Sequence, residues 1–264
     1  MQTTHARHQQ HLYWQKIALG LFLAFLSFQP LFGQNRVKEN LADYDEQWIH
    51  YGFMMSGHTS QYRIKYNDSF TLPQYDSIHS IIPDKLGGFK LGFVVNMYLF
   101  QFLDFRILPT VGFYENTLTY RFTDGNSIRE LKDPTMMELP MLLKYKSVRR
   151  GNIAMYLVGG VNPAWEAVGK GDGVDSREKL ELRRFNFSLD FGAGFDLYYP
   201  LFKFSPEIRA SFGQRNMLTG RTNNYNVNLD ELVTQNVAFF ITFEGGPNYL
   251  KRKRKQRLED KLSN

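Results

Sequence analysis

The sequence predicts an all-β fold: an eight-stranded antiparallel transmembrane β-barrel with short turns at one end and long loops at the other. Three observations support this. Apolar and polar residues alternate over long stretches, the connections between stretches alternate in length, and aromatic residues gather at stretch ends. Alternation with period two puts one set of side chains on each face of a strand. A tilted strand needs about 9–11 residues to cross a bilayer, and several stretches are that long.

The N-terminus has the order of a secretory signal. Residues 17–28 are apolar and follow Lys16, Pro30 breaks the run, and the small residue Gly33 precedes Gln34. This order predicts a cleaved signal peptide over 1–33, because the apolar run is too short to span a membrane comfortably. We therefore expect a periplasmic N-terminal segment at 34–47, the barrel at 48–244, and a basic periplasmic tail at 245–264.

The alternation is clearest in residues 185–199. Odd positions carry groups such as Phe187, Phe191 and Phe195, and even positions carry groups such as Asp190 and Asp196. A helix would mix these two sets on every face, so the segment is predicted to be a strand. The same argument predicts the full set of eight strands, at 48–56, 89–99, 103–113, 136–147, 153–165, 185–199, 202–212 and 236–244.

The connections indicate which kind of barrel this is. Tight joins occur near 100–102, 148–152 and 200–201, whereas 57–86, 123–133, 166–182 and 216–232 are long and polar. Short turns on one side and long loops on the other are typical of outer-membrane barrels. We therefore expect a cell outer-membrane location, and an even strand number places both mature termini on the periplasmic side.

Eight strands enclose an interior just wide enough to be filled by side chains. The polar face of the predicted strands carries both signs of charge, which favours a lumen packed with ion pairs over a conducting pore. We expect the inward charged set to be Lys90, Asp104, Arg106, Glu138, Lys144, Asp190, Asp196, Glu207, Arg209 and Glu244.

The positive charge is concentrated in the tail. Seven basic and two acidic side chains in 245–264 supply +5 of the formal net charge of +6. The rest of the chain is close to neutral, so a nucleic-acid-binding face is not indicated. In an exported protein the cluster is a solvated extension or a contact for an acidic partner or anionic lipid. Its basic residues are Lys251, Arg252, Lys253, Arg254, Lys255 and Arg257.

Residues suited to catalysis or metal binding are few. The chain has no Cys, and beyond the predicted signal it keeps only His50, His58 and His79. His58 with Ser56 and Ser60, near Asp76 and His79, has no spacing that defines a nucleophile and base. The glycine-rich stretch GKGDGVDSREK (169–179) lacks the features of a P-loop or an EF-hand. We therefore predict no catalytic residues, no enzyme activity, no metal and no cofactor.

One segment resembles a known family. MELPMLLKYKSVRRGNIAMYLVGGVNP (137–163) is similar to the PorT family, including its SprT members. The distinctive pieces are Glu138-Leu139-Pro140, Leu143-Lys144-Tyr145-Lys146, Arg149-Arg150, and Gly159-Gly160 with Pro163. The resemblance implies an accessory or assembly role in the type IX secretion system, with protein partners and no reaction. The chain departs from many barrels by running twenty residues past Glu244.

Three functions follow as hypotheses. The first is a non-enzymatic component of type IX secretion, with Arg149, Arg150 and the 251–257 cluster as candidate partner contacts. The second is a generic small barrel for adhesion, envelope integrity or small-ligand binding through its outer loops. The third is a lipid-modifying barrel enzyme centred on His58. For the first we expect contact with outer-membrane lipid, with the barrel-assembly machinery during insertion, and with other secretion proteins.

Overall fold

The computed structural model describes residues 39–42, 44–67, 70, 78–132, 134–167, 182–219, 228–245 and 262. The predicted signal peptide, the basic cluster 251–257, Asp76 and the glycine-rich stretch 169–179 lie outside the described residues. Within the described ranges, no helix is long and apolar enough to cross a membrane.

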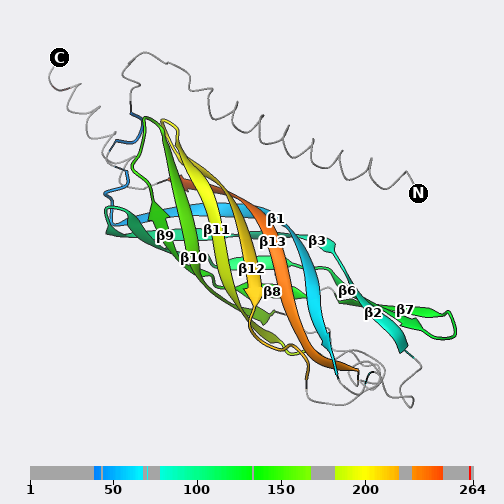
Figure 1. Ribbon diagram of the computed structural model, residues 1–264. Helices are drawn as coiled ribbons and strands as arrows, with labels where there is room; N and C mark the ends of the chain where they lie inside the picture. The colour runs from blue at the N-terminus through cyan, green and yellow to red at the C-terminus, as the bar shows by residue number, and fades with distance from the viewer. Residues whose placement is uncertain are drawn as a thin grey trace, which may run out of the picture. The chain divides into compact units, whose positions relative to one another are not determined.

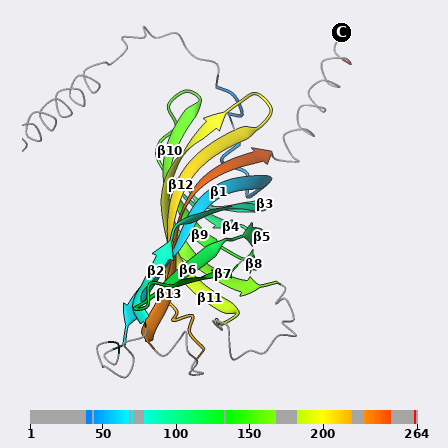
Figure 2. The same ribbon diagram turned by 90° about the vertical axis from the view of Figure 1, so that its right-hand side faces the viewer.

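Eight antiparallel strands close into a ring, which confirms the predicted fold class (Figures 1 and 2). The ring closes where β1 pairs with both β3 and β13. Two of its eight strands are interrupted and carry two labels each. In ring order the strands are β1 (Ile49–Tyr66), β3 (Leu86–Phe100), β4 (Leu103–Ile107) with β5 (Thr110–Phe113), β8 (Thr135–Glu138) with β9 (Met141–Lys146), β10 (Ile153–Glu166), β11 (Phe185–Tyr198), β12 (Lys203–Gly213) and β13 (Leu229–Gly245).

Both interruptions occur at a proline. Pro109 separates β4 from β5 and Pro140 separates β8 from β9, because proline has no amide hydrogen to give to a ladder. Their carbonyl groups still accept hydrogen bonds from the neighbouring strands: Phe93 donates to Pro109, and Leu108 to Pro140, both at 3.0 Å. The wall is therefore continuous across the breaks.

The alternation read from the sequence sorts side chains between the two faces of the wall. On β11, Phe191 and Phe195 are exposed on the outside, whereas Asp190 and Asp196 are buried inside. The outer face of the ring is apolar on the other strands as well, for example at Phe93, Leu157 and Ile208. An apolar exterior around a polar interior is the arrangement of a membrane barrel.

The two ends of the ring differ in their connections. At one end, called here the turn end, β3 joins β4, β9 joins β10, and β11 joins β12 through short turns. The β9–β10 turn contains Gly151 at φ +60°, a left-handed conformation that glycine adopts without steric cost. The long connections all leave from the opposite end, called here the loop end.

The predicted loop at 57–86 is wrong in part. β1 continues as a strand to Tyr66, and a separate three-stranded sheet contains β2 (Ile78–Asp84), β6 (Asn116–Phe122) and β7 (Ser127–Lys132). The outer face of β1 beyond Ser56 is polar, with Gly57, Thr59 and Gln61. A strand lacking an apolar face gives no hydrophobic alternation, so the pattern ended before the strand did.

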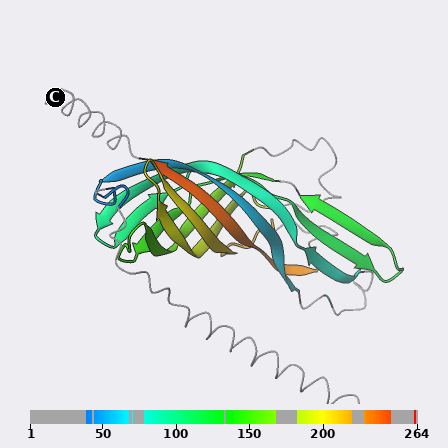
Figure 3. The same cartoon turned by 90° about the horizontal axis from the view of Figure 1, so that it is seen from above.

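The three-stranded sheet has an apolar core of its own at the loop end. Leu118 and Tyr120 of β6 pack with Ile81 of β2, Tyr62 of β1 and Leu232 of β13. In Figure 3 the hairpin of β6 and β7 extends from the barrel at the end opposite to the blue N-terminal residues. The extra lengths of β1 and β13 therefore serve as a support for this second sheet.

Candidate functional site

The lumen holds the chain's main cluster of charged groups. All ten side chains predicted to face inward are buried, and each takes part in an ion pair. Two further lysines, Lys146 and Lys203, join them. In the described residues these pairs connect six basic to six acidic side chains, so the lumen set is electrically balanced.

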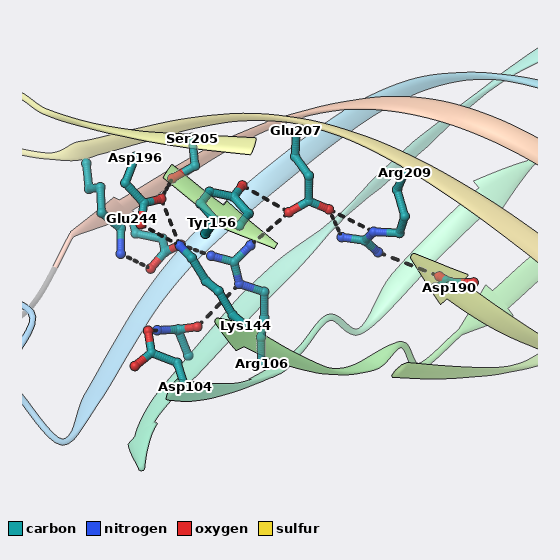
Figure 4. Close-up of polar contacts among 12 residues, drawn as sticks. Asp104, Arg106, Lys144, Tyr156, Asp190, Asp196, Ser205, Glu207, Arg209 and Glu244 are labelled. Carbon is teal, nitrogen blue, oxygen red and sulfur yellow. Dashed lines mark hydrogen bonds and ion pairs between the residues drawn. The ribbon is translucent and has the colours of Figure 1, made fainter. Parts of the chain in front are cut away.

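The larger cluster lies toward the turn end, near the start of β12 and the end of β13. Figure 4 shows its polar contacts. Arg106 of β4 donates to Glu207 of β12 at 3.2 Å and to Glu244 of β13 at 2.9 Å. Lys203 lies 3.1 Å from the second oxygen of Glu244. One guanidinium thus reaches across the lumen from β4 to two adjacent strands, β12 and β13, and each carboxylate retains a second cation.

Two neighbouring ion pairs complete the larger cluster. Lys144 of β9 lies 2.6 Å from Asp196 of β11, and Ser205 donates to the same carboxylate at 2.6 Å. Lys146 lies 2.9 Å from Asp104, whose other oxygen accepts a 2.8 Å hydrogen bond from Asn96. A buried charge is tolerated best when it is paired and hydrogen-bonded. The Lys144–Asp196 pair meets both conditions, whereas Lys146 Nζ and Asp104 Oδ1 form an ion pair at 2.9 Å without a hydrogen bond.

On the side of the lumen formed by β3, β4 and β9, apolar side chains separate this cluster from the charges nearer the loop end. Val94 on β3, Leu108 after β4 and Leu142 on β9 are fully buried and pack with Val158 and Phe240. On β9 and β8, Leu142 lies between Lys144 and Glu138, so apolar contact replaces ion pairing along that strand. The lumen is therefore filled by packed apolar groups as well as by ion pairs.

A second charged group lies on the loop-end side of this layer. Lys90 is 3.0 Å from Glu138, which also accepts hydrogen bonds from Tyr114 and, at 3.0 Å, from Asn162. Arg209 extends the network from the larger cluster, at 2.5 Å from Glu207 and 3.8 Å from Asp190. Glu138 is thus the acceptor on which three lumen side chains converge.

The residues considered for catalysis do not assemble into a triad in the described part of the chain. His58 is buried on the inner face of β1, with its ring 4.4 Å from that of Tyr114. Ser60 donates instead to Asn116 at 2.8 Å, and Ser56 to the carbonyl of Gly57. His79 is exposed on β2. The arrangement offers no nucleophile hydrogen-bonded to His58.

The two adjacent arginines of the β9–β10 turn have different environments. The Arg149 guanidinium lies 3.8 Å from the ring of Tyr198 and donates to carbonyls of Asn40 and Leu41, so it is engaged within the chain. Arg150 is exposed. Of the candidate partner contacts in this turn, Arg150 is the accessible one, and the basic cluster 251–257 lies outside the described residues.

Residues 39–42 and 44–47, called here the strap, lie at the turn-end mouth. Tyr44 stacks on His50 with ring centroids 4.2 Å apart, and the Nζ atom of Lys203 lies 5.1 Å from its ring. Burial raises the pKa of the Tyr44 hydroxyl above its ordinary value, so this group stays neutral. Sequence reasoning missed this contact because nothing in residues 34–47 shows a periodic pattern.

The missed lumen lysines did carry a signal. Lys146 lies two positions after Lys144, and Lys203 lies an even number of positions before Glu207 and Arg209, so each shares a strand face with those residues. Period two therefore placed both on the inner face. They lie at strand ends, where the strand boundary is hardest to read, and this position kept them out of the predicted inward set.

Comparison with solved structures finds small outer-membrane barrels. OprG from Pseudomonas aeruginosa is 13% identical with a TM-score of 0.43, covering 75% of this chain and 93% of that one. Neisserial surface protein A is 11% identical with a TM-score of 0.37, covering 73% and 95%. Ail, the attachment invasion locus protein of Yersinia pestis, is 12% identical with a TM-score of 0.32, covering 75% and 99%.

No curated protein matches the sequence. A family model described as "Outer membrane protein beta-barrel domain" matches residues 29–219, which include seven of the eight strands of the ring. This match agrees with the closed eight-stranded ring, its apolar exterior and its charged interior. The chain therefore belongs to the outer membrane protein beta-barrel domain family and is a β-barrel protein of the outer membrane.

Proposed function

We propose that this protein is a non-enzymatic, non-conducting component or assembly factor of the type IX secretion system. The observation that carries the non-conducting part is the packed, charge-balanced lumen, in which Arg106 bridges Glu207 and Glu244 across the barrel. Wide aqueous channels come with about 16–18 strands, whereas eight strands leave room only for side chains. A barrel without a path through it acts through its two ends.

The secretion role is supported by the resemblance of residues 137–163 to the PorT family. These residues form the end of β8, all of β9, the β9–β10 turn and most of β10. Several of these residues have a clear structural role in the barrel. Glu138 and Lys144 are lumen ion-pair partners, and a Cβ atom at Gly160 would lie 2.1 Å from the carbonyl oxygen of Met141. The resemblance therefore concerns the wall and turn of the barrel.

The orientation that this role requires places the turn end in the periplasm, with both mature termini on that side. Short turns are periplasmic in barrels of this type. Arg150 and the basic cluster 251–257 are then available to acidic surfaces of other secretion proteins, while the apolar exterior contacts outer-membrane lipid. Insertion by the barrel-assembly machinery is supported by the position of Phe243, which lies near the end of the terminal strand β13.

The deciding experiment compares culture-supernatant proteomes of the parent, a deletion strain and strains complemented with variants. We expect proteins carrying the C-terminal secretion signal to leave the medium and accumulate in the periplasm on deletion. The full chain and the His58→Ala variant should both restore export, because His58 has no chemical role here. An unchanged secreted set in the deletion strain would overturn the secretion role and leave only the outer-membrane barrel.

A second candidate is surface binding through the loop end. It is favoured by the three-stranded sheet of β2, β6 and β7, which has its own apolar core and leaves Ile128 and Leu131 of β7 exposed. Changing both residues to Glu would abolish such binding while leaving protein secretion intact. Adhesion or ligand binding that survives the double change, measured on whole cells, would exclude this surface.

A further inference from the structure

The strap closes the turn-end mouth with side chains rather than with a strand. Residues 39–42 and 44–47 form no ladder with the wall, and the backbone pairing with β3 begins at Trp48, whose carbonyl accepts a hydrogen bond from Tyr98 at 2.9 Å. Their contacts are packing and individual hydrogen bonds: Leu41 and Tyr44 pack against Ala154 and Tyr198, and His50 Nε2 contacts the carbonyl of Tyr44 at 2.6 Å. A segment held in this way leaves without breaking the hydrogen bonds of the ring.

Arg149 is the hub of these contacts. Its guanidinium donates to the carbonyls of Asn40 and Leu41 in the strap, to the carbonyl of Gly151 in its own turn, and to the side-chain oxygen of Asn152. Its planar face covers the ring of Tyr198 at 3.8 Å. A guanidinium satisfies several acceptors at once and stacks on an aromatic ring, which lysine cannot do equally well.

Other groups at the mouth complete the attachment. The Asn40 amide nitrogen donates to the Asn152 side chain at 2.8 Å, and the Asn40 side chain donates to the carbonyl of Tyr198 at 3.0 Å. The hydroxyl of Tyr198 donates to Asp45 at 2.6 Å. Tyr198 therefore contacts the strap through its backbone, its ring and its hydroxyl.

The charges beneath the strap are paired without it. Lys203 pairs with Glu244 and Lys144 with Asp196, and all four residues belong to the wall. Losing the strap therefore exposes this cluster to water without leaving a charge unpaired. The ion pairs of the barrel therefore do not depend on the strap.

We propose that the strap is a removable seal over the turn-end mouth, latched to the β9–β10 turn by Arg149, and that its release exposes the buried face around Ala154. This inference does not depend on the secretion role. Arg150 provides a matched control, because it adjoins Arg149 in the same turn and is exposed.

The test uses the full chain, which has no cysteine, so an introduced thiol is the sole site of labelling. Ala154→Cys places the thiol under the strap, where the residue is 3% exposed, and Val148→Cys places it in the turn, where the residue is 67% exposed. The folded protein in phospholipid vesicles is treated with a membrane-impermeant maleimide from the turn-end side. The rate of labelling is measured by mass spectrometry.

We expect Ala154→Cys to react at least tenfold more slowly than Val148→Cys. Adding Arg149→Ala should raise the Ala154→Cys rate at least tenfold, and adding Arg150→Ala should leave it unchanged. Folding of each variant is checked by the resistance of the barrel to unfolding in SDS without heating. If Arg149→Ala fails this check, Tyr44→Ser replaces it as the variant that releases the strap.

Two results would overturn the proposal. The first is rapid labelling of Ala154→Cys in the otherwise unchanged chain, which would mean that no seal exists. The second is slow labelling in every folded strap or latch variant, which would mean that the segment is a permanent part of the barrel. Loss of secretion in any of these strains bears on the proposed function and not on the seal.

Discussion

Replacing Arg106 with methionine tests whether the lumen pairs hold the barrel together. The side chain is fully buried and contacts Glu207, Glu244 and, at 3.3 Å, Asn96. Methionine keeps much of the volume but removes the charge, and the lumen set becomes one positive charge short. Breaking a buried pair by removing one partner costs about 3–5 kcal/mol. Because both carboxylates keep a second cation, we expect a loss of about 3 kcal/mol, at the lower end.

The assay is urea unfolding of the purified barrel in detergent micelles, followed by tryptophan fluorescence. With a slope of about 2 kcal/mol per molar urea, the midpoint should fall by about 1.5 M. Lys65→Met is the matched control, because Lys65 pairs with Asp230 at 2.9 Å with both side chains more than half exposed. An exposed pair contributes about 0–1 kcal/mol, so its midpoint should fall by less than about 0.5 M.

A second variant shows whether charge is the cause. Glu207→Gln combined with Arg106→Met restores the balance of charge in the lumen, so the double variant should lose less stability than the two single losses added together. Contacting residues show interaction energies of about 0.5–3 kcal/mol in such cycles. Equal midpoints for Arg106→Met and Lys65→Met, or strictly additive losses, would refute the reasoning that the lumen pairs are coupled supports.

Three further outcomes are expected. Gly52→Ala should destabilise the barrel by about 1–3 kcal/mol in the same urea assay, because its Cβ would lie 2.2 Å from the carbonyl oxygen of Phe243, whereas Gly57→Ala, with open space around it, should be neutral. Ile208 is exposed on the outer face, and Ile208→Arg should lower the free energy of unfolding by about 2–4 kcal/mol when the barrel is folded into lipid vesicles. An unchanged free energy of unfolding would place this face outside the bilayer. The purified chain should show no steady ion conductance in planar bilayers, and a stable open level would contradict the packed lumen.

The sequence predicted the wall of the barrel closely and its extensions poorly. The strand expected at 185–199 is observed as Phe185–Tyr198, and that expected at 153–165 as Ile153–Glu166. In both, lipid on one side and packed polar groups on the other impose a period of two. β1 runs ten residues past its predicted end, and β2, β6 and β7 were not predicted. These parts are stabilised by packing on each other, so their patterns contain no lipid-facing stripe.

The sequence predicted which charged residues face the lumen but not which of them pair with one another. The period-two alternation along each strand identifies Arg106, Glu207 and Glu244 as inward residues, because side-chain direction is a local property of a strand. The partners of Arg106 are 101 and 138 residues away, and the stagger of the closed ring decides which of them it meets. No local pattern contains that stagger.

Arg149 and Arg150 show the same division at the turn. Side by side in the sequence they are equivalent basic residues, and the sequence by itself determined only that a charged turn joins two strands at the short-turn end. The tertiary structure decided that Arg149 stacks on Tyr198 and binds the carbonyls of residues 40 and 41, while Arg150 stays exposed. The physical reason is that alternation encodes which surface a side chain faces, whereas its contacts depend on segments brought together only when the ring closes.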